Sequence, residues 1–239
     1  MREKKAKKLH QEVKKTYDHI AGEFHNSRKH MVNDLNFIKP YLKKGQKIAD
    51  IGCGNGRFLN LLSENELNEK DYTGIDNSQK LIEIAQNQHP HSNFQEGDFL
   101  NLPLESESTD LSVSIRAFHH LTSKKLRLQA LEEMKRVLKN DGKAIVTVWN
   151  LWHIKNWKIL LKAFARSIYT FGAYSPRDTL VPWGQKIKRY YHAFTTYELQ
   201  KIVDKAGFRI IEVYGISKGE KVTIEKSDDL VIVFDKNNI

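Results

Sequence analysis

Residues 50–56 read Asp-Ile-Gly-Cys-Gly-Asn-Gly and follow a short apolar run that predicts a buried strand. Their three glycines let the main chain take unusual dihedral angles and let a ligand approach the backbone closely. The dinucleotide fingerprint needs a glycine where this chain has Arg57, so the spacing argues against a nicotinamide cofactor. Asp76 ends the next predicted strand, where an acid can bind ribose hydroxyls. Together these residues indicate a nucleoside-like ligand.

Alternating strands and helices must position these residues. Apolar runs predict strands over 47–53, 71–76, 93–98, 109–115, 143–149, 208–214 and 229–234, and periodic segments predict helices over 56–64, 78–88, 124–139 and 195–206. Ser78 is the expected N-cap of the second helix, Asp141-Gly142 ends the third, and 218–220 is the expected turn between the last two strands. We expect an α/β fold with a doubly wound, Rossmann-like, mostly parallel sheet of seven strands. With 239 residues, the chain reads as one domain, 1–239.

Several polar and aromatic segments follow the ends of the predicted strands. They are Asp50–Gly56, Asp76, Asp98–Phe99, Ile115–His120 and Trp149–Trp152. Ligands of open α/β sheets bind outside the carboxyl ends of the strands. We therefore expect these segments to surround one crevice.

The net charge of +10 is concentrated in two segments, 1–15 and 151–190. The first belongs to a predicted basic N-terminal helix or tail, 1–20, and the second to an insertion, 150–194, that shows no clear strand period. The cations of the second segment are Lys155, Lys158, Lys162, Arg166, Arg177, Lys186, Lys188 and Arg189, and its aromatic residues are Trp152, Trp157, Phe164, Tyr169, Phe171, Tyr174, Trp183 and Tyr190. Aromatic faces can stack on bases while cations track phosphates, so a nucleic acid is the expected partner. The same aromatics can instead form the small core of a helical lid.

Composition limits the other classes. The chain has no run of 18 apolar residues and no apolar stretch after its basic start, so we expect neither a membrane span nor a secretory signal, and place the protein in the cytoplasm. The lone cysteine, Cys53, excludes an internal disulfide and a cysteine-based zinc site. The histidines are scattered, and no metal site is predicted.

The chain resembles the class I S-adenosylmethionine-dependent methyltransferases. The resemblance rests on Asp50–Gly56, Gly74-Ile-Asp76, Glu96-Gly-Asp98 before Leu102-Pro103, and Phe118-His-His-Leu121. It implies S-adenosyl-L-methionine as cofactor and S-adenosyl-L-homocysteine as product. The implied cofactor residues are Asp50, Gly52, Cys53, Gly54, Gly56, Asp76, Asn77, Asp98, Phe99 and Ile115. The glycine turn would pass along the methionine part, Asp76 would bind the ribose, and Asp98 with Phe99 would flank the adenine.

A narrower resemblance is to the tRNA wobble-uridine carboxymethyl methyltransferases. It rests on Val13-Lys-Lys-Thr-Tyr17, Ser27-Arg28, Asp178-Thr-Leu-Val-Pro-Trp183, Arg189-Tyr-Tyr-His-Ala-Phe194 and Glu198-Leu199. In eukaryotes this group converts 5-carboxymethyluridine to its methyl ester and works with a small zinc-binding activator. The resemblance implies the tRNA anticodon loop as substrate and such an activator as a partner. Arg116 departs from the family, which has a small residue there.

The acceptor side of this reaction needs little from side chains. A carboxylate is ionised at neutral pH and needs no general base, but its attacking oxygen must stay free of strong hydrogen bonds. The expected acceptor residues are Arg28, His120, Trp149, Arg189, Tyr191 and His192. The sequence leaves open whether His119 or His120 faces the substrate.

Two other functions remain open from the sequence alone. A small-molecule O-methyltransferase acting on a phenol, such as a quinone precursor, would need His119 or His120 as a base, because a phenol has a pKa of about 10. A basic RNA-binding module with a residual cofactor fold would not be an enzyme. The net charge argues against the first, and the intact glycine turn argues against the second.

Overall fold

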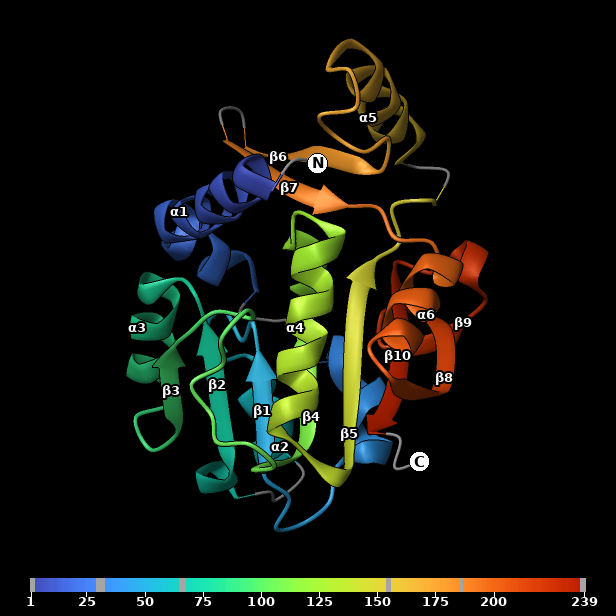
Figure 1. Cartoon of the computed structure of the whole chain (residues 1–239). Helices are drawn as coiled ribbons and strands as arrows, with labels where there is room; N and C mark the ends of the chain where they lie inside the picture. Colours follow the sequence, from blue (N-terminus) through green and yellow to red (C-terminus); the bar gives the residue numbers. More distant parts are fainter. Residues whose placement is uncertain (1–2, 29–32, 65–67, 154–155, 185–186, 237–239) are drawn as a thin grey trace.

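A computed structural model describes residues 3–28, 33–64, 68–153, 156–184 and 187–236 (Figure 1). Lys155 and Lys186 of the predicted basic cluster, and the first two residues of the predicted N-terminal helix, lie outside these ranges.

The described chain forms one large sheet in the order β3-β2-β1-β4-β5-β10-β8-β9. Its strands are β1 (Ile48–Ile51), β2 (Tyr72–Asp76), β3 (Asn93–Glu96), β4 (Thr109–Ile115), β5 (Leu138–Trp149), β8 (Phe208–Ser217), β9 (Glu220–Val222) and β10 (Asp229–Lys236). The first five are parallel, whereas β10 runs antiparallel to both β5 and β8. The α/β class and the mostly parallel sheet are confirmed. The predicted number of seven strands is wrong, because β9 adds an eighth at the edge.

Helices cover both faces of this sheet, as a doubly wound fold requires. On one face lie α4 (Lys124–Val137) and α6 (Thr196–Lys205), and on the other lie the 3-10 helix η1 (Asn33–Tyr41), α2 (Phe58–Glu64) and α3 (Gln79–Gln88). Side chains alternate along β1, so Ile51 packs with α4 and Ile48 packs with α2. The two cores fix β1, and with it the turn that follows.

Some of the helix and strand ends predicted from capping and turn residues are confirmed, and others are wrong. Ser78 caps α3, accepting a hydrogen bond from the backbone N–H of Leu81 at 3.4 Å. The helix predicted to end at Asp141-Gly142 instead ends at Val137, and β5 begins at Leu138, whose backbone is already extended. The turn near Lys218 joins β8 to β9 and not to the last strand, since β9 lies between them in the chain.

Two further segments lie over the carboxyl ends of the strands (Figure 1). One is α1 (Glu3–Arg28), which packs against α3 and β7. The other is the insertion, which holds α5 (Trp157–Tyr169) and a separate antiparallel hairpin of β6 (Asp178–Trp183) and β7 (Ile187–His192). The sequence reading found no strand here, because four consecutive residues at the end of β7 are buried and leave no alternation to detect.

Candidate active site

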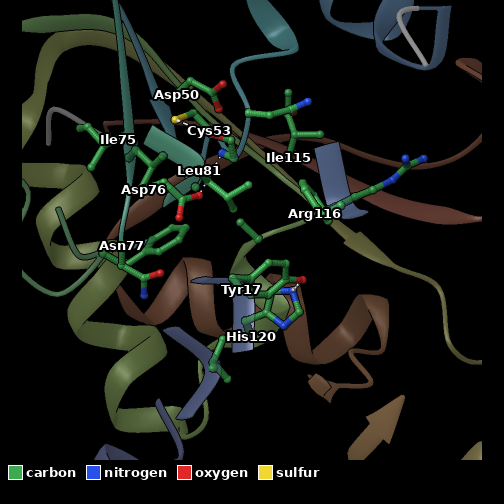
Figure 2. Close-up of a pocket in the computed structure, with 18 of the residues that line it drawn as sticks. Tyr17, Asp50, Cys53, Ile75, Asp76, Asn77, Leu81, Ile115, Arg116 and His120 are labelled. Atoms are coloured by element: carbon green, nitrogen blue, oxygen red, sulfur yellow. Dashed lines mark hydrogen bonds between the residues drawn. The ribbon is translucent and has the colours of Figure 1, made fainter. Parts of the chain in front are cut away.

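A cavity lies at the carboxyl ends of the parallel strands (Figure 2). Helix α1 and the β6–β7 hairpin lie over these strand ends (Figure 1). Of the predicted cofactor residues, Asp50, Gly52, Cys53, Gly54, Asp76, Asn77, Phe99 and Ile115 line it. Of the predicted acceptor residues, Arg28, His120, Trp149, Arg189 and Tyr191 line it. These residues therefore surround one crevice, with Asp50 and Asp76 in one part of its wall and Arg189 in another.

Asp50 supplies the first acid, at the end of β1. Its Oδ2 accepts a hydrogen bond from the Tyr72 hydroxyl at 3.0 Å, while its buried Oδ1 has no partner among the described residues. Burial raises the pKa of Asp50 to about 7. A buried acceptor without a donor costs free energy, so this atom fits the ammonium group of a ligand.

Asp76 supplies the second acid and closes the glycine turn. Its carboxylate accepts hydrogen bonds from the backbone N–H groups of Gly54 at 2.9 Å and Ser78 at 2.8 Å. Burial raises the pKa of Asp76 to about 6, although these two bonds lower it. Gly52 has a φ of +79°, and a Cβ there would lie 2.3 Å from Cβ of Ala117. The turn therefore requires glycine for its shape and its close packing.

Arg189 is the main cation of the opposite part. It is 4% exposed, and its guanidinium lies over the rings of Trp183, Tyr191 and Trp149 at 4.4, 5.2 and 5.7 Å. Within the described ranges no carboxylate forms an ion pair with it, and its Nε has no hydrogen-bond partner. A buried charge normally has an opposite charge beside it. Arg189 therefore fits an anion that enters the cavity.

Tyr17 and His120 meet at the cavity wall (Figure 2), and Arg189 Nη1 lies 3.4 Å from the Tyr17 oxygen. The Tyr17 hydroxyl lies 2.7 Å from His120 Nε2, and His120 Nδ1 lies 2.7 Å from the carbonyl oxygen of Tyr190. A carbonyl only accepts, so Nδ1 carries the proton of the neutral ring and Nε2 accepts from Tyr17. Burial lowers the pKa of His120 to about 3. The ring is thus neutral at physiological pH, and its one lone pair is occupied.

His119 lies behind His120 and does not line the cavity. It is 1% exposed, and its Nδ1 accepts the backbone N–H of Trp149 at 3.1 Å. Burial holds the pKa of His119 well below its usual range, so its proton sits on Nε2. Of the two histidines that the sequence could not separate, His120 is the one that faces the cavity.

Helix α1 closes the cavity from above through polar contacts. Its His10 bonds Asp98 at 2.8 Å, its Lys14 bonds Glu96 at 2.5 Å, and its Asp18 accepts from the Ser78 hydroxyl at 2.7 Å. The Asp98 carboxylate is engaged by His10 and is not part of the cavity wall.

Three predicted site residues are not brought to the cavity. Asp98 is one, and Gly56 is another, because it packs on Phe94 and Ala85 between helix and sheet. The third is His192, whose ring lies on the other face of β7 from Tyr191. Adjacent side chains of a strand point in opposite directions, so only one of the two can face the cavity.

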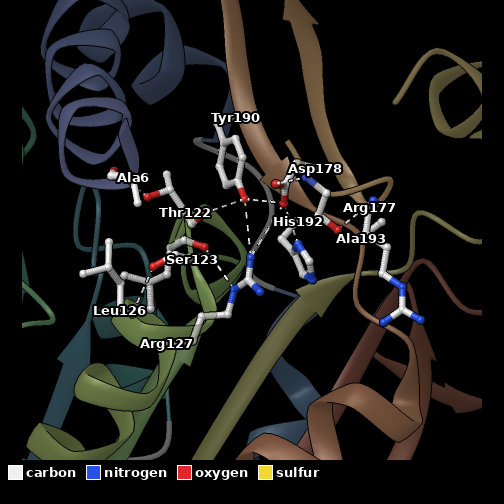
Figure 3. A network of polar contacts seen from close by, with 12 residues as sticks. Ala6, Thr122, Ser123, Leu126, Arg127, Arg177, Asp178, Tyr190, His192 and Ala193 are labelled. Carbon is white, nitrogen blue, oxygen red and sulfur yellow. Dashed lines mark hydrogen bonds and ion pairs between the residues drawn. The ribbon is translucent and has the colours of Figure 1, made fainter. Parts of the chain in front are cut away.

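His192 instead belongs to a buried polar network (Figure 3). Its Nδ1 lies 2.8 Å from Asp178 and its Nε2 lies 3.0 Å from Glu198. The Tyr190 hydroxyl also donates to Asp178, at 2.7 Å, and the Arg127 guanidinium lies 3.9 Å from the same carboxylate. The network fastens the β6–β7 hairpin to α4 and α6, and it determines which face of β7 meets the cavity.

Three more arginines line the cavity wall: Arg28, Arg57 and Arg116. Arg57 lies near Asp50, and its buried Nη1 has no hydrogen-bond partner among the described residues. Arg116 donates to Asp229 from Nε and Nη2 and to Asp34 from Nη1, so its charge is neutralised within the protein. Its φ of +55° is unusual for a side chain with a Cβ, and these ion pairs hold it there. Arg28, at the end of α1, has its pKa lowered by burial and by the charge of Arg116.

One wall of the cavity comes from α1 and was not predicted from the sequence. His10, Val13, Tyr17 and Phe24 of α1 line it, although none was a predicted site residue. Their spacing of 3, 4 and 7 residues places them on one face of a helix, which was the available signal. The lysines around them made the segment look like a solvated tail.

Comparisons with known proteins agree with this architecture. A family described as "Methyltransferase domain" matches residues 49–146. Two solved structures share the fold, each with a TM-score of 0.68. A methyltransferase from Methanosarcina mazei has 22% identity over 83% of this chain and 96% of its own. A putative methyltransferase from Haloferax volcanii, in complex with the Trm112 methyltransferase activator, has 18% identity over 95% of this chain and 98% of its own.

Curated relatives give the narrower match. A tRNA (carboxymethyluridine(34)-5-O)-methyltransferase of Schizosaccharomyces pombe is 31% identical over 227 residues, 84% of this chain and 90% of that protein. ALKBH8 of Macaca fascicularis, with the same activity in its name, is 36% identical over 62% of this chain, but the match spans 21% of that longer protein. No helix in the described ranges is long and apolar enough to cross a membrane. The chain belongs to the S-adenosylmethionine-dependent methyltransferase family and resembles its tRNA (carboxymethyluridine(34)-5-O)-methyltransferases.

Proposed function

We propose that this protein methylates the carboxylate of 5-carboxymethyluridine at the wobble position of tRNA. The observation that carries the proposal is Arg189, a buried cation at the cavity wall with no ion-pair partner in the described chain. A carboxylate entering beside it would relieve an uncompensated charge. The name of the fission-yeast relative supplies the substrate class.

The acidic part of the cavity fits S-adenosylmethionine. Asp50 offers an unpartnered buried oxygen to the amino group of the methionine part, and Asp76 with Asn77 would hold the ribose hydroxyls. Gly52, Cys53 and Gly54 would pass along the methionine part, while Phe99 and Ile115 would form apolar walls for the adenine. When bound, the cofactor supplies a methyl group on positively charged sulfur, which a carboxylate oxygen takes while the C–S electron pair stays on sulfur and no proton moves.

The cationic part fits a carboxylate acceptor. Arg189 would orient the carboxylate, with Arg28 adding positive charge. Tyr191 stacks on Trp149, with ring centroids 4.9 Å apart and planes at 18°, and the pair would form a flat wall against the uracil ring. Holding the two reactants in line can supply roughly 7–11 kcal/mol of the barrier reduction.

The histidines argue against the phenol-methylating alternative. That reaction needs a base with a free lone pair in the cavity. The Nε2 lone pair of His120 accepts from Tyr17, and the Nδ1 lone pair of His119 accepts from the backbone of Trp149. Carboxylate methylation needs neither.

The insertion supports a nucleic-acid substrate. The side chains of Trp157, Phe164, Tyr169 and Phe171 are more than half exposed, next to the exposed Lys158 and Lys162. Tyr190 of the same insertion is buried. The insertion therefore has a packed interior and presents other aromatic and basic side chains at its surface. Exposed aromatics of this kind suit stacking on unpaired bases of an anticodon loop.

The test is methyl transfer in a purified system. The protein is incubated with labelled S-adenosylmethionine and tRNA that carries 5-carboxymethyluridine, with and without a Trm112-type activator, since the Haloferax relative was solved with one. We expect the methyl ester of that nucleoside, and none on tRNA with unmodified uridine at the same position. Absence of the ester under both conditions, from protein that binds the cofactor, would refute the proposal.

A further inference from the structure

Four groups beside the cavity form one directed hydrogen-bond chain. Arg189 Nη1 donates to the Tyr17 oxygen at 3.4 Å, and the Tyr17 hydroxyl donates to His120 Nε2 at 2.7 Å. His120 Nδ1–H then donates to the carbonyl of Tyr190 at 2.7 Å. The direction is fixed from its far end, because a backbone carbonyl cannot donate. Tyr17 therefore has its only proton committed to His120.

The direction of the Tyr17 hydrogen bond matters because Tyr17 lies next to Arg189. Its oxygen is within reach of the guanidinium that would hold an acceptor carboxylate. A phenol is a good donor, and a free one beside a carboxylate would bond to it. A hydrogen bond to the attacking oxygen stabilises the charged ground state more than the transition state, in which that charge is being lost, and so slows transfer.

We propose that His120 is a positioning residue that holds the Tyr17 proton away from the acceptor carboxylate, so that Arg189 orients the carboxylate while the attacking oxygen stays free. This inference rests on the proposed function, since it assumes a carboxylate acceptor. It gives His120 a role that involves no proton transfer to or from the substrate.

His120 meets three requirements of this role. Its ring packs against Tyr17 and Tyr191, with centroids 5.1 and 4.5 Å away, and the Tyr17 hydroxyl occupies Nε2 at 2.7 Å. The Tyr190 carbonyl fixes the tautomer that accepts. That carbonyl belongs to the residue next to Arg189, so strand β7 positions both ends of the chain. Bonds in such a chain strengthen one another in a site of low dielectric constant.

The decisive test is a rescue experiment. His120→Ala leaves the Tyr17 hydroxyl free, and we expect kcat to fall about 10- to 100-fold, the range of one hydrogen bond to a charged group, while KM for tRNA stays the same or decreases. Adding Tyr17→Phe to that variant removes the competing donor, and we expect kcat to recover at least about fivefold. As a matched control, His120→Ala with Tyr197→Phe changes a tyrosine that is 69% exposed on α6 and should stay slow.

A purely structural role for His120 predicts the opposite result. The double variant would then be as slow as His120→Ala or slower, and that outcome overturns the inference. Cofactor affinity and thermal unfolding of each variant show whether the fold is intact. If wild-type protein makes no ester at all, the proposed function fails; if wild-type protein is active but rescue is absent, only the role of His120 fails.

A second measurement does not depend on activity. Nitrogen chemical shifts of the His120 ring in the wild-type protein should show a protonated Nδ1 and an unprotonated Nε2 across neutral pH, and Tyr17→Phe should shift Nε2 most. A protonated Nε2 would contradict the direction of the chain and overturn the inference.

Discussion

At the scale of single residues, the site separates two kinds of unsatisfied group. Asp50 is a buried acid with an unused oxygen, and Arg189 is a buried cation with an unused nitrogen. Each costs stability in the free protein, and each matches one charge of the proposed reactants, an ammonium and a carboxylate. Binding of the two reactants would therefore relieve the destabilisation that these two unpartnered groups cause in the free protein.

Asp50→Asn should remove the destabilisation that the ionised Asp50 carboxylate causes. The folded pKa of about 7 exceeds the unfolded value, so the folded state binds more protons between about pH 4 and pH 7, and ionising Asp50 lowers the unfolding free energy as pH rises through that range. We expect the variant to unfold at a higher temperature than wild type at pH 8, with the difference shrinking towards pH 4. The same variant should bind S-adenosylhomocysteine at least about tenfold more weakly. Calorimetry measures both; equal stability at pH 8 would contradict the account.

Most of the proposed cofactor residues could be placed at the cavity from the sequence, because their positions are set locally. The glycine turn and Asp76 are set by backbone shape and strand ends, which the sequence encodes within a few positions. Whether Tyr17 and His192 reach the cavity depends on which face of α1 and of β7 packs inward. Tyr191 and His192 were both predicted at the site, although strand geometry allows only one.

At the scale of elements, the β6–β7 hairpin carries two of the proposed acceptor residues, Arg189 and Tyr191, and is held by the polar network of His192, Asp178 and Glu198. The His192 ring lies between two carboxylates, with Nδ1 2.8 Å from Asp178 and Nε2 3.0 Å from Glu198. Burial alone would raise the pKa of Glu198, but His192 and Arg177 lower it to about 2. The hairpin was not predictable as strands, because its burial comes from partners far away in sequence.

Glu198→Gln should weaken this anchor in a pH-dependent way. A lowered carboxylate pKa stabilises the fold above the unfolded value of about 4.5, and that stabilisation is lost as pH falls towards about 2. We expect a loss on the order of 2 kcal/mol at pH 7 by urea unfolding, narrowing from about pH 4.5 downwards. Glu132→Gln, on the exposed face of α4, is the control and should change little. A loss that is the same at pH 7 and pH 3 would rule out this explanation.

At the scale of the whole molecule, the cavity and the segments proposed to contact tRNA lie on one side of the sheet. Helix α1, the β6–β7 hairpin and α5 all lie beyond the carboxyl ends of the parallel strands (Figure 1). Residues at these strand ends, together with α1 and β7, line the cavity. The net charge of +10 favours a polyanion and predicts salt-sensitive binding. Charge and alternation of elements could be read from the sequence, but the docking of α1 over the site could not, since its lysines hide its apolar face.

Replacing two exposed aromatics of α5 should weaken tRNA binding. With Trp157→Ala and Phe164→Ala together, we expect the Kd for tRNA to rise about 10-fold or more, given about 1–3 kcal/mol for each stacked base. Cofactor affinity should not change. Tyr197→Ala, also an exposed aromatic but outside the insertion, is the matched control. Unchanged affinity for tRNA in a filter-binding assay would mean that α5 does not contact the substrate.

The central claim concerns the acceptor, and mass spectrometry of tRNA nucleosides after deletion of the gene tests it most directly. We expect loss of the methyl ester, accumulation of 5-carboxymethyluridine, restoration by the wild-type gene, and no restoration by Arg189→Gln. An unchanged level of the methyl ester, in cells with no second enzyme of this activity, would show that the wobble carboxylate is not the acceptor.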